Sequence, residues 1–181
     1  MIHKHSGVPA VRASIGTGLA VAVRAPLGLR PPALWAGLRF GGAAAAAVAA
    51  GVAATTALPR VRAGMHGREL PEGAVRWLAL DIPLGTVWTE ETIFRGVLAS
   101  LAARAIGPSR GRLLQAAAFG LWHIPDAKRT GESIVGTVLV TAVAGWVFGW
   151  LAERSGSVLA PVLAHLAINE AGAVAALVVQ R

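Results

Sequence analysis

Long stretches without a single charged side chain constrain the fold of this chain more than any other feature of its sequence. Residues 40–59 and 133–152 contain no charged residue; the first is mostly Ala, Gly and Val, and the second is richer in Val, Leu and Trp. A helix needs about 20 predominantly apolar residues to cross the hydrocarbon layer of a bilayer. Both stretches therefore predict membrane-spanning helices.

Three further apolar segments are less simple. Residues 113–124 are few for a span and are followed by Pro125, so they predict either a short span or a buried helix. Residues 77–103 and 155–180 carry polar side chains, which are Asp81, Glu90, Glu91 and Arg95 in the first segment and His165, Asn169 and Glu170 in the second. A charged side chain at the bilayer centre costs about 2.5 to 3.5 kcal/mol. These two segments can therefore span only if their polar side chains face the protein interior.

The composition agrees with a membrane location. Hydrophobic residues make up 55% of the 181 residues and charged residues 14%, with a mean hydropathy of +0.60, whereas about a quarter of the residues of a soluble domain are charged. We predict an all-α fold, a polytopic membrane helical bundle of about five or six helices, integral and multi-pass in a bacterial-type cell membrane. Residues 33–181 would form this domain, and residues 1–32, basic and rich in Pro and Gly, predict a flexible tail.

The net charge of +8 is distributed in a way that argues against nucleic acid as a partner. The arginines form short clusters between apolar runs, and no basic face with interleaved aromatic residues is present. Such clusters are expected in loops that contact lipid headgroups. The loops on both sides of residues 40–59 are basic, so the distribution of Lys and Arg does not decide the orientation. The oligomeric state is left open too, although small residues at 41–51 permit close helix packing.

Two carboxylates and an arginine lie close together in the sequence WTEETIFRG, residues 88–96. Glu91 and Arg95 are four residues apart, so on a helix they lie one above the other and can form an ion pair in the favourable order. That pair would offset much of the cost of burying Arg95. Glu90 lies about 100° around the helix from Glu91 and cannot share this geometry. Glu90 is therefore the freer carboxylate and the better candidate for chemistry.

Two histidines in other segments have partners at the same helical spacing. Phe119 and His123 are four residues apart, as are His165 and Asn169, so each pair lines one face of its own helix. Pro125 disfavours helical backbone in the residue before it, which places His123 close to the end of its helix. Three helices can then bring a carboxylate, an imidazole and an imidazole–carboxamide pair to one pocket. The tryptophans are expected to pack or to lie at the membrane interface.

Three motifs resemble those of a known family. EETIFRG (residues 90–96), FGLWH (119–123) and HLAIN (165–169) resemble, in this order, the motifs EExxxR, FxxxH and HxxxN/B of the CPBP family. This is the CAAX-protease and bacteriocin-processing group of intramembrane proteases, also called the Abi or type II CAAX prenyl endopeptidase-like family. Residues 149–169 are similar to the family's lead into its last motif. The resemblance covers about residues 77–172 and predicts that they form the catalytic core.

The resemblance implies an intramembrane endopeptidase, a hydrolase that cleaves a membrane-associated peptide or protein. By similarity, Glu90 and His123 would activate a water molecule. His165 and Asn169 would polarise the scissile carbonyl and stabilise its oxyanion, and Glu91 and Arg95 would support the site by orientation and charge balance. The partners expected on this basis are the lipid bilayer and a peptide or protein substrate.

The use of a metal is left open by the sequence. Members of the family are commonly called metalloproteases, and Glu90, His123 and His165 would be legitimate zinc ligands. A water activated by a glutamate and a histidine does not require an ion, however. The chain contains no HExxH motif and no cysteine, so no independent zinc signature supports Zn²⁺ as a cofactor.

Two other classes of function fit the same residues. A catalytically silent relative would bind a partner in the membrane, as in an immunity or scaffold role. A small transporter component would use the carboxylates as a proton or cation relay. The identity of the substrate is also open, including whether it is prenylated, because a family resemblance does not fix a substrate.

Overall fold

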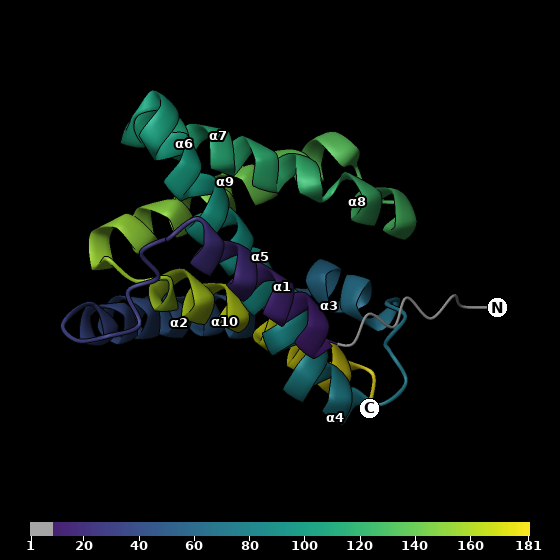
Figure 1. Ribbon diagram of the computed structural model, residues 1–181. Coiled ribbons are helices and arrows are strands. Elements are labelled where there is room, and N and C mark those ends of the chain that lie inside the picture. Colours follow the sequence, from purple (N-terminus) through teal and green to yellow (C-terminus); the bar gives the residue numbers. More distant parts are fainter. Residues whose placement is uncertain (1–8) are drawn as a thin grey trace.

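The computed structural model describes residues 9–181 of the chain, and within that range all regular structure is helical (Figure 1). In chain order the elements are α1 (Pro9–Ala22), α2 (Ala33–Thr56), α3 (Pro59–His66), α4 (Ala74–Arg76), η1 (Trp77–Trp88), α5 (Thr89–Glu91), η2 (Thr92–Leu98), α6 (Ala99–Ile106), α7 (Pro108–Trp122), α8 (Ile124–Thr130), α9 (Ile134–Ser155) and α10 (Leu159–Val179). The all-α prediction is confirmed.

Three helices are long and apolar enough to cross a membrane, and these are α2, α9 and α10. They correspond to the uncharged runs at residues 40–59 and 133–152 and to the polar-interrupted run at 155–180. In α10, His165 is buried, and Asn169 and Glu170 are half-buried. The polar side chains of this helix are thus at least partly shielded by protein, as spanning requires.

The segments from α4 to α6 follow one another without a break and form a single helical rod over residues 74–106. Its segments η1 and η2 are π-helical, and η1 contains Pro83. Proline has no N–H to donate, and π-helical turns, whose hydrogen bonds reach five residues back, recur at functional sites. Glu90 and Glu91 lie on the α-helical turn α5 between the two wider stretches.

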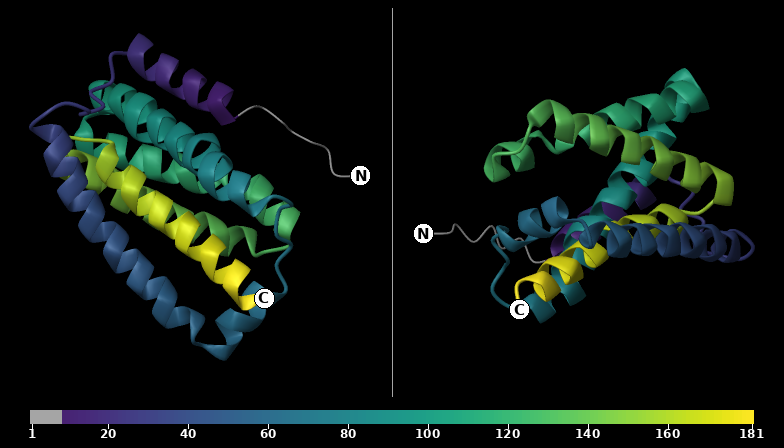
Figure 2. Two further views of the ribbon diagram at one scale, coloured as in Figure 1. Left: turned by 90° about the horizontal axis from the view of Figure 1, so that it is seen from below. Right: turned by 180° about the vertical axis from the view of Figure 1, so that it is seen from behind.

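The rod lies between two groups of helices. Figure 2 (left) shows α1, the rod, α10 and α2 side by side in that order. Helices α7 to α9 lie on the other side of the rod in Figure 1, where α7 packs against α9 and against α6, the last segment of the rod. The rod contacts α10 through η1 and contacts both α7 and α9 through η2. Side chains of α5 and η2 can therefore meet residues of α7, α9 and α10.

Glycines allow the closest helix contacts. A Cβ at Gly41 of α2 would lie 2.9 Å from the Cα of Ala160 in α10, and a Cβ at Gly145 of α9 would lie 3.1 Å from the Cβ of Phe119 in α7. Gly42 and Gly51 have open space beside them. Close packing is thus confined to one edge of the small-residue run at 41–51, and Gly145 brings α9 near enough for its backbone to join the site.

The flexible tail predicted for residues 1–32 is wrong where α1 lies; residues 1–8 are outside the described range. Helix α1 packs against η1, α5 and η2, and its buried Ala13, Gly16 and Ala20 recur at helical spacing. The Trp88 indole N–H also donates to the Thr17 hydroxyl at 2.9 Å. The small side chains on this face of α1 let the helix approach the rod closely.

Candidate active site

A fully buried ion pair lies at the centre of the site. Arg95 Nη1 is 3.1 Å from Glu91 Oε1, and neither side chain has any exposed surface. Arg95 Nη2 also donates to the backbone carbonyl of Gly145 at 3.3 Å. The ion pair expected from the four-residue spacing is present. Removing one partner of such a pair leaves an uncompensated charge, which costs about 3 to 5 kcal/mol.

The same carboxylate oxygen of Glu91 reaches across to α10. His165 Nδ1 lies 2.7 Å from Glu91 Oε1. A carboxylate that pairs with an arginine only accepts hydrogen bonds, so Nδ1 carries the proton and donates it. This fixes the orientation of the imidazole and leaves its Nε2 as the atom that can act on another group.

Aromatic rings enclose Arg95 and His165. The Arg95 guanidinium carbon lies 4.2 Å from the ring centroid of Phe119 and 5.0 Å from that of Phe148. Phe148 stacks on the His165 ring at 5.1 Å, and Phe119 meets it edge-on at 5.8 Å. Cation–π contacts in a desolvated setting contribute on the order of 2 kcal/mol. The cage keeps water from Arg95 and holds the His165 ring in one plane.

Glu90 makes different contacts from Glu91. Its Oε1 accepts a hydrogen bond from the indole N–H of Trp122 at 3.3 Å. Its Oε2 lies 4.0 Å from His165 Nε2 and is buried without a hydrogen-bond partner. The Glu90 side chain is 14% exposed, so it lies next to the surface. As the helical spacing of residues 90, 91 and 95 indicates, Glu90 takes no part in the ion pair of Glu91 and Arg95.

His123 lies at the junction between α7 and α8, with φ of −86° and ψ of 0°. The prediction that Pro125 places it at a helix end is confirmed. Its Nδ1 is 2.8 Å from the carbonyl oxygen of Phe119, which can only accept, so Nδ1 carries the proton and Nε2 has the lone pair. The His123 and Phe119 rings lie 4.8 Å apart.

Asn169 is one helical turn after His165 in α10 but makes only a local contact among the described residues. Its Nδ2 donates to the carbonyl oxygen of His165 at 3.2 Å. A carboxamide has two N–H donors, so one remains for another acceptor. The structure thus joins Glu90, Glu91, Arg95 and His165 by direct polar contacts or close approach, while His123 and Asn169 adjoin this group through Phe119 and His165.

Three residues of the site were not identified from the sequence. Trp122 was expected to pack or to lie at the interface, yet it donates to Glu90. Gln115 is fully buried and donates to the Gly145 carbonyl at 2.9 Å, the same oxygen that Arg95 uses. Gln115, Phe119 and His123 are spaced four residues apart and therefore share one helix face. An amide on that face of an apolar helix is a sequence signal that could have identified Gln115. Phe148 carries no such signal.

The donor atoms considered for zinc match that metal in type but are not gathered into a site. Within residues 9–181 no group of three or more His, Cys, Asp or Glu side chains is placed to hold an ion. Two ligands about 2.1 Å from a tetrahedral zinc are about 3.4 Å apart, and Glu90 Oε2 and His165 Nε2 are 4.0 Å apart. The residues as arranged do not form a zinc centre, so no catalytic step is assigned to an ion.

Comparison with protein families identifies the group to which this chain belongs. The family model described as type II CAAX prenyl endopeptidase Rce1-like matches residues 72–171, more than half of the chain. No curated protein and no solved structure matches the chain. The matched range includes the ion pair, both candidate histidines and Glu90. The chain therefore belongs to the Rce1-like family of type II CAAX prenyl endopeptidases, as its three motifs predict.

Proposed function

We propose that this protein is an intramembrane endopeptidase in which Glu90 and His123 activate a water molecule to cleave a membrane-associated peptide or protein. The observation that carries the proposal is the state of Glu90. Its Oε2 is buried without a hydrogen-bond partner and lies 4.0 Å from Nε2 of His165. A buried polar atom without a partner is uncommon, and a substrate water between the two atoms would satisfy it.

The chemistry follows from the protons of the site. Glu90 takes one proton from the water, and His123 Nε2 holds the water in place by accepting a hydrogen bond from it. The water oxygen then attacks the scissile carbonyl carbon. The negative charge that develops on the carbonyl oxygen is stabilised by an N–H donor of Asn169 Nδ2 and by His165 Nε2, which takes up a proton from the solvent before the attack and then donates to the oxyanion. The carbon–nitrogen bond of the tetrahedral intermediate then breaks as the proton on Glu90 passes to the nitrogen, so that the amine leaves and Glu90 is a carboxylate again.

Glu91 and Arg95 act through His165. Glu91 holds His165 Nδ1 at 2.7 Å, so Nε2 is the nitrogen that faces Glu90. Arg95 balances the charge of Glu91 in a cage that excludes water. These two are positioning residues, and they touch neither the water nor the peptide bond in this scheme.

Trp122 supports a route for the substrate. Its indole N–H is bonded to Glu90, while 59% of its surface is exposed. A polypeptide arriving on this face from the lipid side would meet Glu90 directly behind the indole. The family name makes a prenylated C-terminal CAAX peptide the first substrate to test.

The test uses the full-length protein reconstituted in liposomes with a farnesylated CAAX peptide. Glu90→Gln retains the shape and the hydrogen bond from Trp122 but cannot take a proton, so cleavage should fall by at least about 100-fold. Glu170→Gln is the matched control, because Glu170 lies in α10 outside these contacts and its substitution should leave the rate unchanged. Circular dichroism establishes that both variants are folded.

Full cleavage by Glu90→Gln would refute the proposed role. If no peptide is cleaved by the wild type, membranes from cells with the wild type and with Glu90→Gln can be compared by proteomics for a protein that accumulates uncut. A phenotype that is unchanged in Glu90→Gln would favour the catalytically silent partner-binding role. Glutamate-dependent proton flux without cleavage would favour the transporter role.

The contribution of zinc is tested separately. The proton transfers assigned to Glu90 and His123 need no ion, so we expect dialysis against a chelator to leave cleavage unchanged. Loss of cleavage that added Zn²⁺ restores would instead assign Glu90, His123 and His165 as its ligands.

A further inference from the structure

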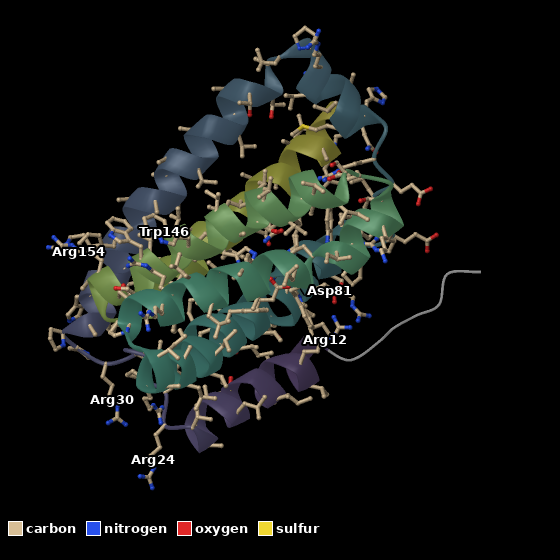
Figure 3. All side chains as sticks on the ribbon, turned by 90° about the horizontal axis from the view of Figure 1, so that it is seen from above. Arg12, Arg24, Arg30, Asp81, Trp146 and Arg154 are labelled. Atoms are coloured by element: carbon tan, nitrogen blue, oxygen red, sulfur yellow. The ribbon has the colours of Figure 1, made fainter. Side chains whose placement is uncertain are left out.

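A cavity of about 550 Å³ lies at the end of the bundle where α1, α6 and α9 end and α7 and α10 begin. Neither Glu90 nor either candidate histidine lines it. Much of its wall consists of small apolar side chains, including Ala99, Ala103, Ala152 and Val158. Figure 3 shows Arg24, Arg30 and Arg154 at this end, far from Arg12 and Asp81 at the other.

The lining of this cavity is strongly cationic. Arg24, Arg95, Arg104 and Arg112 contribute to it, and Glu153 is the single carboxylate among its lining residues. Glu91 neutralises Arg95, and Glu153 lies 2.6 Å from Arg112. Within residues 9–181 no carboxylate pairs with Arg24 or Arg104; Arg104 donates instead to the carbonyl of Val23 at 2.6 Å. The cavity therefore has two positive charges in excess.

Some polar atoms of the lining lack partners. The Nε atoms of Arg95 and Arg112 are buried without a hydrogen-bond acceptor in the described part of the chain. For Arg95 the whole side chain lacks exposed surface. The N-terminus of α7, a helix of 15 residues, is at the cavity edge because Pro108 lines it. A helix N-terminus carries partial positive charge. Buried N–H groups usually have acceptors, so these observations together indicate an anionic ligand.

We propose that this cavity binds the phosphate group of an anionic amphiphile, supplied by the bilayer as an anionic phospholipid. Guanidinium groups match phosphate oxygens in charge and geometry, and basic pockets among transmembrane helices bind lipid headgroups. The apolar wall of Ala99, Ala103 and Ala152 suits the glycerol and the start of the acyl chains. A free phosphate ion offers the same charge but would leave this apolar wall uncovered.

The test measures lipid binding by the purified full-length protein in a neutral detergent, with native mass spectrometry and short-chain phosphatidylglycerol or phosphatidylcholine as the probes. We expect the wild type to retain phosphatidylglycerol in preference to phosphatidylcholine. Arg104→Gln should weaken phosphatidylglycerol binding about fivefold. Arg154→Gln removes an arginine from the same end of the molecule but not from the lining, and should bind as the wild type does.

A variant of opposite sign guards against misfolding as the cause. Glu153→Gln removes the carboxylate that competes with phosphate for Arg112, so it should strengthen binding, which a damaged fold would not do. Inorganic phosphate at the same concentration as the lipid should fail to displace it. Equal retention of the two lipids, or unchanged binding by both Arg104→Gln and Glu153→Gln, would overturn the proposal. Displacement by inorganic phosphate would overturn the lipid as the ligand.

Discussion

Glu91 and Arg95 should be energetically coupled, so that replacing both costs less than the sum of the two single losses. Their side chains are completely buried and 3.1 Å apart. Arg95→Met leaves the carboxylate of Glu91 in a cavity without its cation, and an uncompensated charge of this kind costs about 3 to 5 kcal/mol. The lost contact with the Phe119 ring at 4.2 Å places the expected loss in the upper part of that range.

Glu91→Gln should lower the free energy of unfolding by a similar amount. Arg95 would then have no ion-pair partner among the described residues and would keep a hydrogen bond to a neutral acceptor, the Gly145 carbonyl oxygen at 3.3 Å. When both changes are combined no buried charge is left unpaired. The double variant is therefore expected to be about 2 to 3 kcal/mol more stable than the sum of the single losses predicts.

Unfolding can be followed by circular dichroism in mixed micelles as a denaturing detergent is added. The surface pair Arg129 and Asp126, with nitrogen and oxygen 3.0 Å apart and both side chains mostly exposed, is the matched control. Its coupling should be below about 1 kcal/mol. Additive losses for Glu91 and Arg95, or single losses no larger than those of the surface pair, would refute the reasoning.

Two further changes probe the surroundings of the site. Trp122→Phe keeps an aromatic ring at this position but removes the indole N–H that donates to Glu90 at 3.3 Å. We expect kcat to fall about tenfold at an unchanged Tm, whereas a Tm that falls with kcat would mean that the indole only packs. Gly145→Ala forces a Cβ to 3.1 Å from Phe119 and should destabilise the protein by about 1 to 3 kcal/mol in a melting experiment. Gly42→Ala, which meets open space, should not destabilise it.

Local periodicity accounts for the part of the site that the sequence predicts. The ion pair of Glu91 and Arg95 depends on two residues of one helical rod, so their spacing alone describes it. The same holds for His123, whose place at a helix end follows from the nearby proline. The all-α fold follows from the length of the uncharged runs, because these depend on composition within single segments.

Contacts between segments far apart in the sequence cannot be predicted from local periodicity. The bond between Glu91 and His165 joins residues 74 positions apart, and no spacing rule relates them. Phe148 of α9 stacks on His165 of α10 at 5.1 Å, and no spacing rule relates these two residues either. Helix α1 lies within residues 1–32, whose basic and Pro- and Gly-rich composition predicts a flexible tail. Its packing against the rod is a tertiary effect that outweighs the local preferences of these residues.

The division of work between the two glutamates makes stability and catalysis separable in this site. Oε1 of Glu91 is within bonding distance of both Arg95 and His165, so any change at Glu91 alters the buried charge balance and the orientation of the histidine together. Glu90 bonds only to Trp122 among the described residues, and one of its oxygens already lacks a partner. Neutralising Glu90 therefore removes little native stabilisation. Its effect on cleavage consequently reports on the chemical step, whereas the effect of Glu91 combines both contributions.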